Sequence, residues 1–388
     1  MKMTGAEMAV KTLEKNGVKV VFGYPGAANC PIIDKLSFSS IKHILTRNEQ
    51  GAAHMASGYA RVTKQAGVCT ATSGPGATNL ITGIATAYMD SIPMVALTGQ
   101  VATKLIGKDA FQEVDITGAT LPFTKHSYLI KDGLDIPKVV NEAFHIANTG
   151  RPGPVLIDFP MDILKMEFDY PDEEDEVNIR GYKLLGKANE SQVKKVSEAV
   201  RKAKKPVILA GGGIVTSDAM TEFRKFVKET DIPVVSTMMG IGTIPTDNPR
   251  YYGMIGSHGV KRANMIFNRA DLVIVMGSRL GDRTVANVKG LEEGNKLIHI
   301  DIDPAEIGKN IQPYIPVVGD IKDVLEQLIP LISGYKADKE WTDEADELQC
   351  RHDQRYEIRH PFTQDKSTVD RIQRIRPART SQRSYTYR

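Results

Sequence analysis

Strand and helix signals alternate along the first 160 residues, and this alternation constrains the fold more than any other feature of the sequence. Thr4 can cap a helix that runs to about Asn16, and another helix is expected from about Glu49 through Tyr59. Short apolar segments that read as strands separate the helices, at 18–22, 43–46, 68–72, 93–98, 127–131 and 155–159. Because parallel strands need crossover helices, the pattern predicts an α/β fold with a helix-covered parallel sheet.

The same alternation resumes after an acidic break. Residues 169–176 carry six acids and a proline, a composition typical of a linker. Beyond it, the sequence predicts helices at 191–202 and 218–228 and strands at 206–210, 234–235, 272–276 and 297–300. We therefore predict two consecutive domains of this class, at 1–165 and 189–335, joined by an acidic linker at 166–188.

The remaining residues, 336–388, differ from both predicted domains. Residues 336–360 are highly charged and are consistent with one helix. Residues 367–388 contain six arginines, no lysine and almost no apolar periodicity, which favours a disordered tail. A basic RNA-binding arm is the alternative interpretation of this segment.

Composition excludes several classes of protein. The 50 basic and 47 acidic residues give a net charge of +3, too balanced to indicate a nucleic-acid binder. Cys30, Cys69 and Cys350 lie far apart with no CxxC pair, so neither a zinc site nor a disulfide framework is indicated, and we assign no metal ligands. No apolar run approaches the roughly 18 residues of a membrane span, and the first residues lack the apolar core of a signal peptide. A cytoplasmic protein is expected.

Loops that follow the predicted strands are the first candidates for a site, because ligands of open parallel sheets bind beyond the carboxyl ends of the strands. In the first predicted domain these loops are 23–28, 47–51, 73–79 and 98–100. Glycines there let the backbone approach a ligand, and prolines restrict the loop. On the residues alone, the simplest interpretation of Glu49 is a carboxylate at a helix start that the helix dipole stabilises. Residues 73–79 are equally well explained as a turn followed by a helix cap and as a functional loop.

Six segments in one order resemble a single family. They are FGYPG at 22–26, EQGAAHMASGYAR at 49–61, SGPGATN at 73–79, DSIP at 90–93, GKDAFQE at 107–113 and GRPGPV at 150–155. Together they resemble the large subunit of acetolactate synthase (acetohydroxyacid synthase), a thiamine-diphosphate enzyme, from about Thr4 to at least Ile332. The resemblance implies a pyrimidine-binding domain followed by a flavin-binding-type middle domain.

The resemblance implies roles for residues of the first domain. A glutamate at the place of Glu49 hydrogen-bonds N1′ of the cofactor's aminopyrimidine and supports the proton transfer that activates the thiazolium ring for attack on a 2-keto acid. Gln112 would act as a donor at the reacting centre and Phe111 would pack there, although Phe111 is as readily a core residue. The residues that would line the pyrimidine pocket are Pro25, Gly26 and Asn79.

The resemblance also implies contacts with FAD, most of them in the second domain. Gly211, Gly212 and Gly213 follow a predicted strand and suit backbone contact with a diphosphate, although a tight turn also explains them. Asp301 closes a strand, where a carboxylate can bind a ribose or adenine group; its alternative role is a helix cap. The other implied contacts are Arg151, His258, Gly259, Gly277, Ser278, Arg279, Asp303, Val318 and Asp320. The flavin would be largely structural, because the net reaction is not a redox one.

Several positions depart from the family pattern. Ala27 replaces a second glycine, Asn48 replaces a histidine, Leu280-Gly281 replaces a Phe-Asp pair, and Met161 replaces a lysine of the substrate channel, which leaves the preferred keto acid open. The family's third domain, in which a Gly-Asp-Gly stretch and a later asparagine hold Mg²⁺ and the diphosphate, has no counterpart in this sequence. We therefore expect a truncated or frame-shifted chain that is inactive alone.

The sequence thus predicts an acetolactate synthase catalytic subunit that condenses pyruvate with pyruvate or 2-ketobutyrate in valine, leucine and isoleucine biosynthesis. Thiamine diphosphate, FAD and Mg²⁺ are the expected cofactors. A homodimer or tetramer is expected, with a small regulatory subunit as a further partner and with neither nucleic acid nor membrane. Two alternatives stay open: another thiamine-diphosphate carboligase or decarboxylase, and a non-catalytic fragment that binds FAD or a partner subunit.

Overall fold

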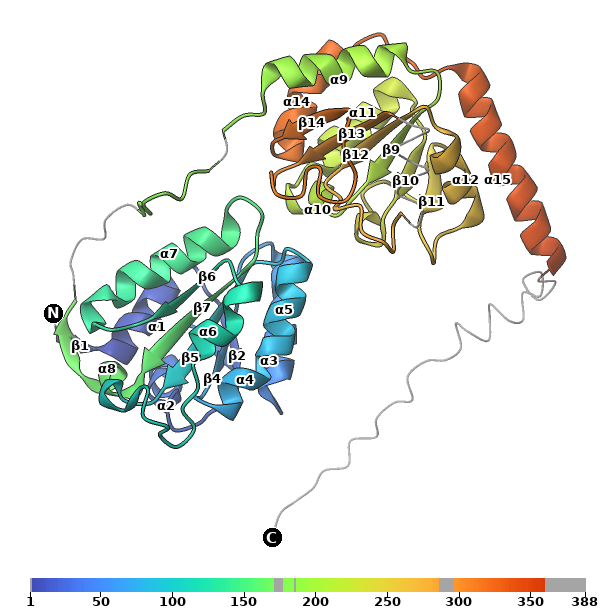
Figure 1. The fold of residues 1–388 in the computed structure, drawn as a ribbon. Coiled ribbons are helices and arrows are strands. Elements are labelled where there is room, and N and C mark those ends of the chain that lie inside the picture. Colours follow the sequence, from blue (N-terminus) through green and yellow to red (C-terminus); the bar gives the residue numbers. More distant parts are fainter. Residues whose placement is uncertain (1, 171–176, 185, 286–295, 360–388) are drawn as a thin grey trace. The chain divides into compact units, whose positions relative to one another are not determined.

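The computed structural model describes residues 2–170, 177–184, 186–285 and 296–359, with side chains described as far as residue 350. It divides into two compact units, Met1–Leu185 and Gly186–Arg388, and each is described by itself (Figure 1). Each unit contains a six-stranded parallel sheet with helices on both faces, so the predicted α/β class is confirmed. In the described part of the chain, no helix combines the length and the apolar character needed to cross a bilayer.

The first unit follows the predicted alternation. Its strands are β1 (Lys2–Thr4), β2 (Val20–Gly23), β3 (Lys42–Leu45), β4 (Gly67–Ala71), β5 (Met94–Gln100), β6 (His126–Leu129), β7 (Pro154–Pro160) and β8 (Glu167–Asp169). Its α-helices are α1 (Gly5–Lys15), α2 (Cys30–Leu36), α3 (Glu49–Thr63), α4 (Pro75–Asn79), α5 (Ile81–Met89), α6 (Ile116–Thr120), α7 (Ile136–Asn148) and α8 (Met161–Lys165). Short 3₁₀ turns lie at Thr103–Leu105, Leu121–Phe123 and Gly133–Asp135.

The first sheet has the strand order β3–β2–β4–β5–β7–β6. Successive strand residues point to opposite faces. Val68 therefore joins the core beneath α1, α2 and α7, whereas Cys69 joins a second core beneath α3 and α5. This second core is rich in alanine, and α3 approaches the sheet so closely that a Cβ at Gly67 would lie 2.1 Å from Ala56 O. The close packing fixes α3, and with it the loop that leads into its first residue.

Thr4 caps α1, as predicted. Its Oγ1 accepts a hydrogen bond from Glu7 N over 3.3 Å, while Glu7 Oε2 accepts from Thr4 N over 2.8 Å. Such a reciprocal pair satisfies two backbone donors at the helix start. The pKa of the Glu7 carboxyl is lowered, chiefly by the hydrogen bond from the Thr4 backbone.

The segment 166–188, which the sequence suggests as a linker, contributes to the first unit at its start. Strand β8 pairs antiparallel with β1, with Lys2 opposite Asp169. Phe168 and Tyr170 pack against the core beneath α1 and α7, which is why the chain does not leave the unit at residue 165. The acidic run 171–176 lies outside the described residues.

The second unit repeats the architecture. Its strands are β9 (Pro206–Ala210), β10 (Val234–Ser236), β11 (Tyr251–Met254), β12 (Leu272–Met276), β13 (Lys296–Asp301) and β14 (Ile315–Val318). Its helices are α9 (Glu190–Lys202), α10 (Gly213–Thr216), α11 (Met220–Thr230), α12 (Lys261–Arg269), α14 (Ile321–Leu331) and α15 (Lys339–Arg359), with a 3₁₀ turn at Met238–Gly240.

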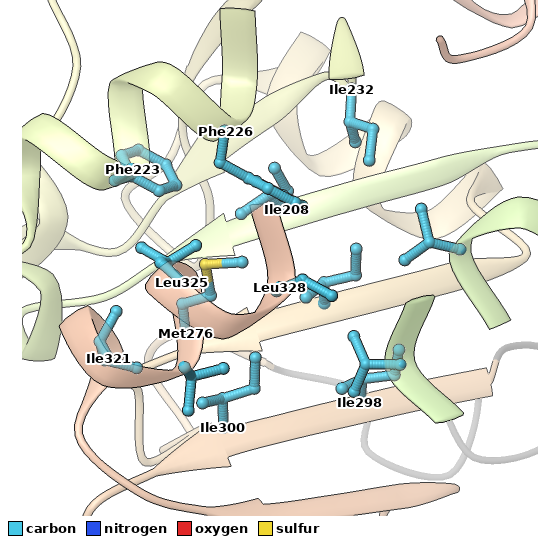
Figure 2. Close-up of a cluster of buried hydrophobic side chains, with 14 of the residues drawn as sticks. Ile208, Phe223, Phe226, Ile232, Met276, Ile298, Ile300, Ile321, Leu325 and Leu328 are labelled. Atoms are coloured by element: carbon cyan, nitrogen blue, oxygen red, sulfur yellow. The ribbon is translucent and has the colours of Figure 1, made fainter. Parts of the chain in front are cut away.

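The second sheet has the strand order β11–β10–β9–β12–β13–β14. In chain order this is 3-2-1-4-5-6, the order of a doubly wound sheet, and it reverses between β9 and β12. Figure 2 shows the core on one face, where Ile208 and Met276 of the strands meet Phe223 of α11 and Leu325 of α14. A second core covers the opposite face and includes residues of α12 and α15.

Helix α15 is part of this second core. Trp341 is only 1% exposed, and its indole Nε1 donates to Pro206 O over 2.8 Å. Ala345 and Leu348 follow on the same apolar stripe. The predicted charged helix is therefore present, and it completes the packing of the second unit beyond the boundary at residue 335 that the sequence suggested. The predicted tail, 367–388, lies outside the described residues.

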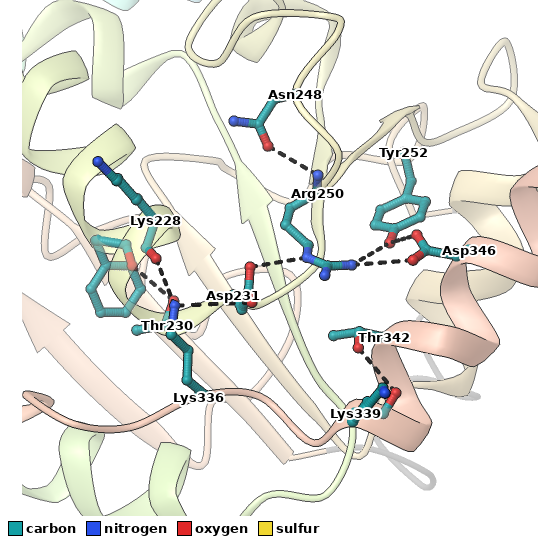
Figure 3. A network of polar contacts seen from close by, with 11 residues as sticks. Lys228, Thr230, Asp231, Asn248, Arg250, Tyr252, Lys336, Lys339, Thr342 and Asp346 are labelled. Atoms are coloured by element: carbon teal, nitrogen blue, oxygen red, sulfur yellow. Dashed lines mark hydrogen bonds and ion pairs between the residues drawn. The ribbon is translucent and has the colours of Figure 1, made fainter.

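Polar contacts hold the same helix against the strands. Tyr252 Oη donates to Asp346 Oδ1 over 2.6 Å, and the Arg250 guanidinium bridges Asp231 and Asp346 over 3.1 and 3.4 Å (Figure 3). Just before α15, Lys336 Nζ donates to the carbonyl oxygen of Lys228, in the last turn of α11, over 2.9 Å. Helix α15 is thus attached through both apolar and ionic contacts.

Candidate functional site

The loops after β2 and β4 interlock at the carboxyl edge of the first sheet, where the strand order reverses. Ala28 N donates to Thr72 Oγ1 over 3.1 Å, and a Cβ at Gly26 would lie 2.5 Å from Thr72 Cβ. Buried Asn29 holds the first loop from inside, because its Oδ1 accepts from Gly26 N over 2.8 Å. Only glycine fits at position 26, and the exposed Pro25 sits directly before it.

Glu49 is the first residue of α3 and is half-buried. Asn48 caps this helix by accepting from Gly51 N over 2.6 Å. Asn79, the last residue of α4, donates its Nδ2 to Glu49 Oε2 over 3.0 Å. A Cβ at Gly76 would lie 3.5 Å from Glu49 Oε1. The structure therefore brings Glu49 and Asn79 together, beside the loop that follows β4.

Phe111 and Gln112 lie in the segment between β5 and α6. Phe111 is 87% exposed, so the alternative interpretation of it as a core residue is wrong. Gln112 is exposed and has a left-handed backbone, with φ 56°. Its backbone lies against the loop after β4, because a Cβ at Gly74 would be 2.6 Å from Gln112 O. These two residues are therefore available to a ligand at the same edge.

Residues 98–100, which the sequence suggests as a loop, belong to β5 and are buried. A Cβ at Gly99 would lie 2.5 Å from the carbonyl carbon of Ala28, so this strand end forms a floor beneath the loop after β2. The strand continues because β7 pairs with it as far as Pro160.

Sequence reasoning missed Thr72, Asn29 and Asp158. Asp158 is 2% exposed; its Oδ1 accepts from Thr98 Oγ1 over 2.6 Å and its Oδ2 from Gln100 Nε2 over 2.9 Å. Burial raises the pKa of Asp158 to about 6. The signal available in the sequence was an aspartate inside the otherwise apolar run 154–160.

Gly211 and Gly213 meet the loop after β12 at the reversal point of the second sheet. Gly211 N donates to Met276 O over 2.9 Å, and Gly213 N donates to Gly277 O over 3.0 Å. A Cβ at Gly211 would lie 2.1 Å from Gly277 O, and one at Gly213 would lie 2.6 Å from Gly277 Cα. Tight packing of the two loops accounts for these glycines, and contact with a diphosphate stays a prediction.

The turn after β13 holds Asp301 and Asp303. Asp301 Oδ1 accepts from Asp303 N, and Asp303 Oδ1 accepts from Ala305 N, each over 2.9 Å. Asp301 thus caps a turn and not a helix. Buried His299 lies just before it, with Nε2 2.9 Å from Ser278 O. Burial lowers the pKa of His299.

The other predicted flavin contacts are distributed over loops and strand ends. His258 and Gly259 lie between β11 and α12, Gly277 to exposed Arg279 follow β12, and Val318 ends β14. Asp320 caps α14 by accepting from Lys322 N over 2.9 Å, and burial raises its pKa. Arg151 lies in the first unit, where its Nε donates to Ser91 Oγ over 2.8 Å.

An exposed apolar group beside Gly212 was also missed. A Cβ at Gly212 would lie 2.9 Å from Met239 Cβ. The side chains of Met238, Met239 and Ile241 are 68%, 44% and 51% exposed. They stand at the carboxyl edge of β10, where a planar ring could cover them.

Among the residues that the structure describes, no three His, Cys, Asp or Glu side chains gather as metal ligands.

Comparison with known proteins identifies the family to which both units belong. The N-terminal TPP binding domain of thiamine pyrophosphate enzymes matches residues 3–119, and the central domain of these enzymes matches residues 193–328. The chain belongs to the thiamine pyrophosphate (thiamine diphosphate) enzymes.

Within that class, several curated relatives are named acetolactate synthase large subunit. The chain is 50% identical over 352 residues to a probable one from Methanocaldococcus jannaschii, covering 89% of this chain and 59% of the relative. It is 46% identical over 363 residues to that of Corynebacterium glutamicum, covering 92% and 58%. With the Haemophilus influenzae protein, identity is 42% over 381 residues, covering 96% and 66%. The chain therefore spans little more than half the length of the first two relatives.

Proposed function

We propose that this chain carries the thiamine-binding and flavin-binding-type domains of an acetolactate synthase catalytic subunit. The reaction joins two molecules of pyruvate into 2-acetolactate with release of CO2, or joins pyruvate to 2-ketobutyrate. The observation that carries the proposal is the position of Glu49 at the start of α3, oriented by Asn79 beside the loop after β4. Its support is the identity of 42–50% to proteins named for this activity.

The residues at this edge suit the aminopyrimidine end of thiamine diphosphate. Glu49 offers a half-buried carboxylate whose Oε2 is already held by Asn79, so its other oxygen can hold the proton of a ring nitrogen. The loop of Pro25 and Gly26 supplies backbone at close range. When bound, thiamine diphosphate supplies the nucleophile and electron sink for decarboxylation of a 2-keto acid.

Two further side chains would act on the substrate. Gln112 can donate its amide to a carbonyl or carboxylate oxygen, and exposed Phe111 can exclude water from the same region. Both project from one turn, so their spacing is fixed by the backbone of that turn. This gives the first unit a proton-holding group, a donor and an apolar cover.

FAD is the second cofactor that we propose. The sheet order 3-2-1-4-5-6 places Gly211 to Gly213 and Gly277 at the reversal point, where dinucleotides bind in such sheets. The Asp301 carboxylate can accept from a ribose or adenine group, and exposed Met238 and Met239 can cover a planar ring. His258, Gly259, Ser278, Arg279, Asp303, Val318, Asp320 and Arg151 are proposed as further contacts.

The wider setting is also a proposal. We propose a homodimer or tetramer in the cytoplasm, with a small regulatory subunit, acting in valine and isoleucine biosynthesis. Exposed apolar side chains on β3 and α3 support contact between subunits; Leu45, Met55 and Val62 are 64%, 48% and 84% exposed. Mg²⁺ is proposed as a cofactor of the family reaction, but the described side chains supply no donor set for it, and no step is derived through it.

One residue favours a second candidate, another thiamine-diphosphate carboligase or decarboxylase. Met161, the first residue of α8, stands where the family places a channel lysine. Without that ammonium, a carboxylate substrate is attracted less strongly. Comparing product formation from pyruvate, 2-ketobutyrate and glyoxylate, with Met161→Lys as the restoring variant, distinguishes the two candidates.

Cofactor binding tests the proposal directly. Thiamine diphosphate with Mg²⁺ is titrated into the chain by calorimetry, and acetolactate is measured after addition of pyruvate and FAD. We expect wild type alone to bind weakly and to form no acetolactate, because the described side chains supply no donor set for Mg²⁺. Glu49→Gln should weaken binding at least about tenfold further, since a carboxylate bond to a ring nitrogen is lost. Glu167→Gln, which removes an exposed carboxylate from β8, is the control. Absence of binding at millimolar cofactor contradicts the proposal.

A further inference from the structure

The segment between β5 and α6 carries Phe111 and Gln112, yet outside one short 3₁₀ turn it has no helix or strand of its own. Its backbone groups must therefore find other partners. Two carboxylates, those of Glu113 and Asp162, and the side-chain amide of Gln100 supply them, and Glu113 is the central one.

Glu113 folds the turn 107–113 back on its own side chain. One carboxylate oxygen accepts from Gly107 N, and the other accepts from Lys108 N and Ala110 N over 3.3 and 3.0 Å. The Glu113 backbone N in turn donates to Ala110 O over 2.9 Å. Hydrogen bonds from backbone N–H groups lower the pKa of the Glu113 carboxyl, so it is ionised at neutral pH.

Both ends of the segment are anchored separately. Near its start, Asp162 of α8 accepts from Thr103 N over 3.0 Å and from Thr103 Oγ1 over 2.6 Å. Near its end, Gln100 Nε2 donates to Val114 O over 2.8 Å and also to buried Asp158. The ends are therefore fixed to α8 and to the sheet, and only the turn between them depends on Glu113.

The turn has an unfavourable backbone that needs such support. Asp109 and Gln112 are not glycines, yet both have left-handed backbones, with φ 51° and 56°. Conformations of this kind persist when surrounding contacts over-determine them. Gln112 is also fitted against Gly74, where there is no room for a Cβ.

We propose that Glu113 is a positioning residue, whose carboxylate fixes the turn 107–113 so that Gln112 stays against Gly74 at the edge of the site. The roles of Gln112 and Phe111 rest on the proposed function. The fixing of the turn by Glu113 does not.

Hydrogen–deuterium exchange of the 388-residue chain tests the fixing of the turn. In Glu113→Gln, an NH2 group replaces one acceptor oxygen and faces backbone N–H groups. We expect the amides of Gly107, Lys108 and Ala110 to exchange at least about tenfold faster, with the amides of β4 and β5 unchanged. The matched control, Asp109→Asn, removes an exposed carboxylate from the same turn at a position where asparagine tolerates the left-handed backbone, and it should leave exchange unchanged.

Two results would overturn the proposal. One is exchange of the three amides in Glu113→Gln at the wild-type rate. The other is an equal acceleration throughout the first unit, which shows a general loss of stability in place of local positioning. Tryptic cleavage after Lys108 gives a second measurement of the same local opening, and it should rise together with exchange.

Carboligation from pyruvate, where wild type shows it, adds a functional readout. Glu113→Gln should lower kcat about tenfold with KM little changed, and the double variant with Gln112→Ala should lose no more than Gln112→Ala alone. Losses that multiply would contradict the assigned role. If wild type binds no thiamine diphosphate, the proposed function fails, while the exchange result still decides the role of Glu113 in the turn.

Discussion

Asn79 Nδ2 donates to Glu49 Oε2 over 3.0 Å and so connects the last residue of α4 to the first residue of α3, across 30 positions of sequence. The helix start alone determines where the Glu49 backbone lies. The bond from Asn79 determines how its carboxylate is turned, and it leaves Oε1 facing the loop of Gly76.

Removing this bond should weaken cofactor binding without unfolding the protein. In Asn79→Ala, Glu49 loses a charge-assisted hydrogen bond, and we expect affinity for thiamine diphosphate to fall about tenfold. Asn79→Asp should cost more, because two carboxylates then face each other. Calorimetric titration checks both variants, and Thr78→Ala, next to Asn79 in α4, is the control. Equal affinity of Asn79→Ala and wild type contradicts the role given to this bond.

Gly211 should be intolerant of any side chain. A Cβ there would lie 2.1 Å from Gly277 O, so Gly211→Ala forces the loops after β9 and β12 apart. We expect the free energy of unfolding to fall by about 1–3 kcal/mol, the usual cost of overpacking. Gly281→Ala is the matched control, because a Cβ at that glycine of the same unit meets nothing within 4 Å. Urea denaturation measures both, and equal stability of the two variants would argue against loop packing.

Trp341 should anchor α15 to the second unit. Its side chain is 1% exposed and donates to Pro206 O, so Trp341→Ala should lower the free energy of unfolding by about 3–5 kcal/mol. Trp341→Phe keeps most of the packing and should cost about 1–3 kcal/mol for the carbonyl left without its donor. Circular dichroism must follow unfolding, because Trp341 is the chain's one tryptophan. A cost below about 1 kcal/mol for Trp341→Ala would show that α15 is not held there.

Asp158 should make stability depend on pH in an unusual direction. Burial raises its pKa from 3.8 to about 6, so the folded protein binds this proton more tightly than the unfolded chain does. The resulting stabilisation is complete below pH 3.8 and is lost as pH rises through about 6, a change of up to about 3 kcal/mol. Carboxylates with lowered pKa values, such as Glu7, act in the opposite direction.

The variant Asp158→Asn isolates this effect, because its amide does not titrate. Urea denaturation of wild type and variant at pH 4.5 and 7.5 gives the difference in unfolding free energy at each pH. That difference should move in favour of the variant by about 2 kcal/mol at the higher pH. A difference that stays constant would mean that Asp158 does not titrate in this range.

Much of the fold could be read from apolar runs, because fully buried parallel strands are nearly continuous in apolar residues. The predicted strands 206–210 and 272–276 coincide with β9 and β12. Strands β11 and β14 were not predicted, because each contains a residue that is unusual in a strand. Strand β11 contains Gly253 with φ 106°, and β14 contains Pro316 and lies at the sheet edge, where proline is tolerated.

The site was less accessible to sequence reasoning. Glu49 and Asn79 were chosen by resemblance, but their contact depends on the order of β3, β2 and β4 in the sheet, which periodicity does not encode. The role of Glu113 in fixing the turn 107–113 depends on three backbone N–H groups, which converge on its carboxylate only after folding. Trp341 looked like part of a charged helix, because its apolar stripe is short and interrupted by acids.

The pairing of β1 with β8 places the first and the last strand of the first unit side by side. A unit whose first and last strands are neighbours can be closed with a short peptide and reopened elsewhere, as in circular permutation, without disturbing its central sheet. It can also be inserted whole into a surface loop of another protein. The short antiparallel pair of β1 and β8 therefore makes this α/β unit suitable for transfer into another protein.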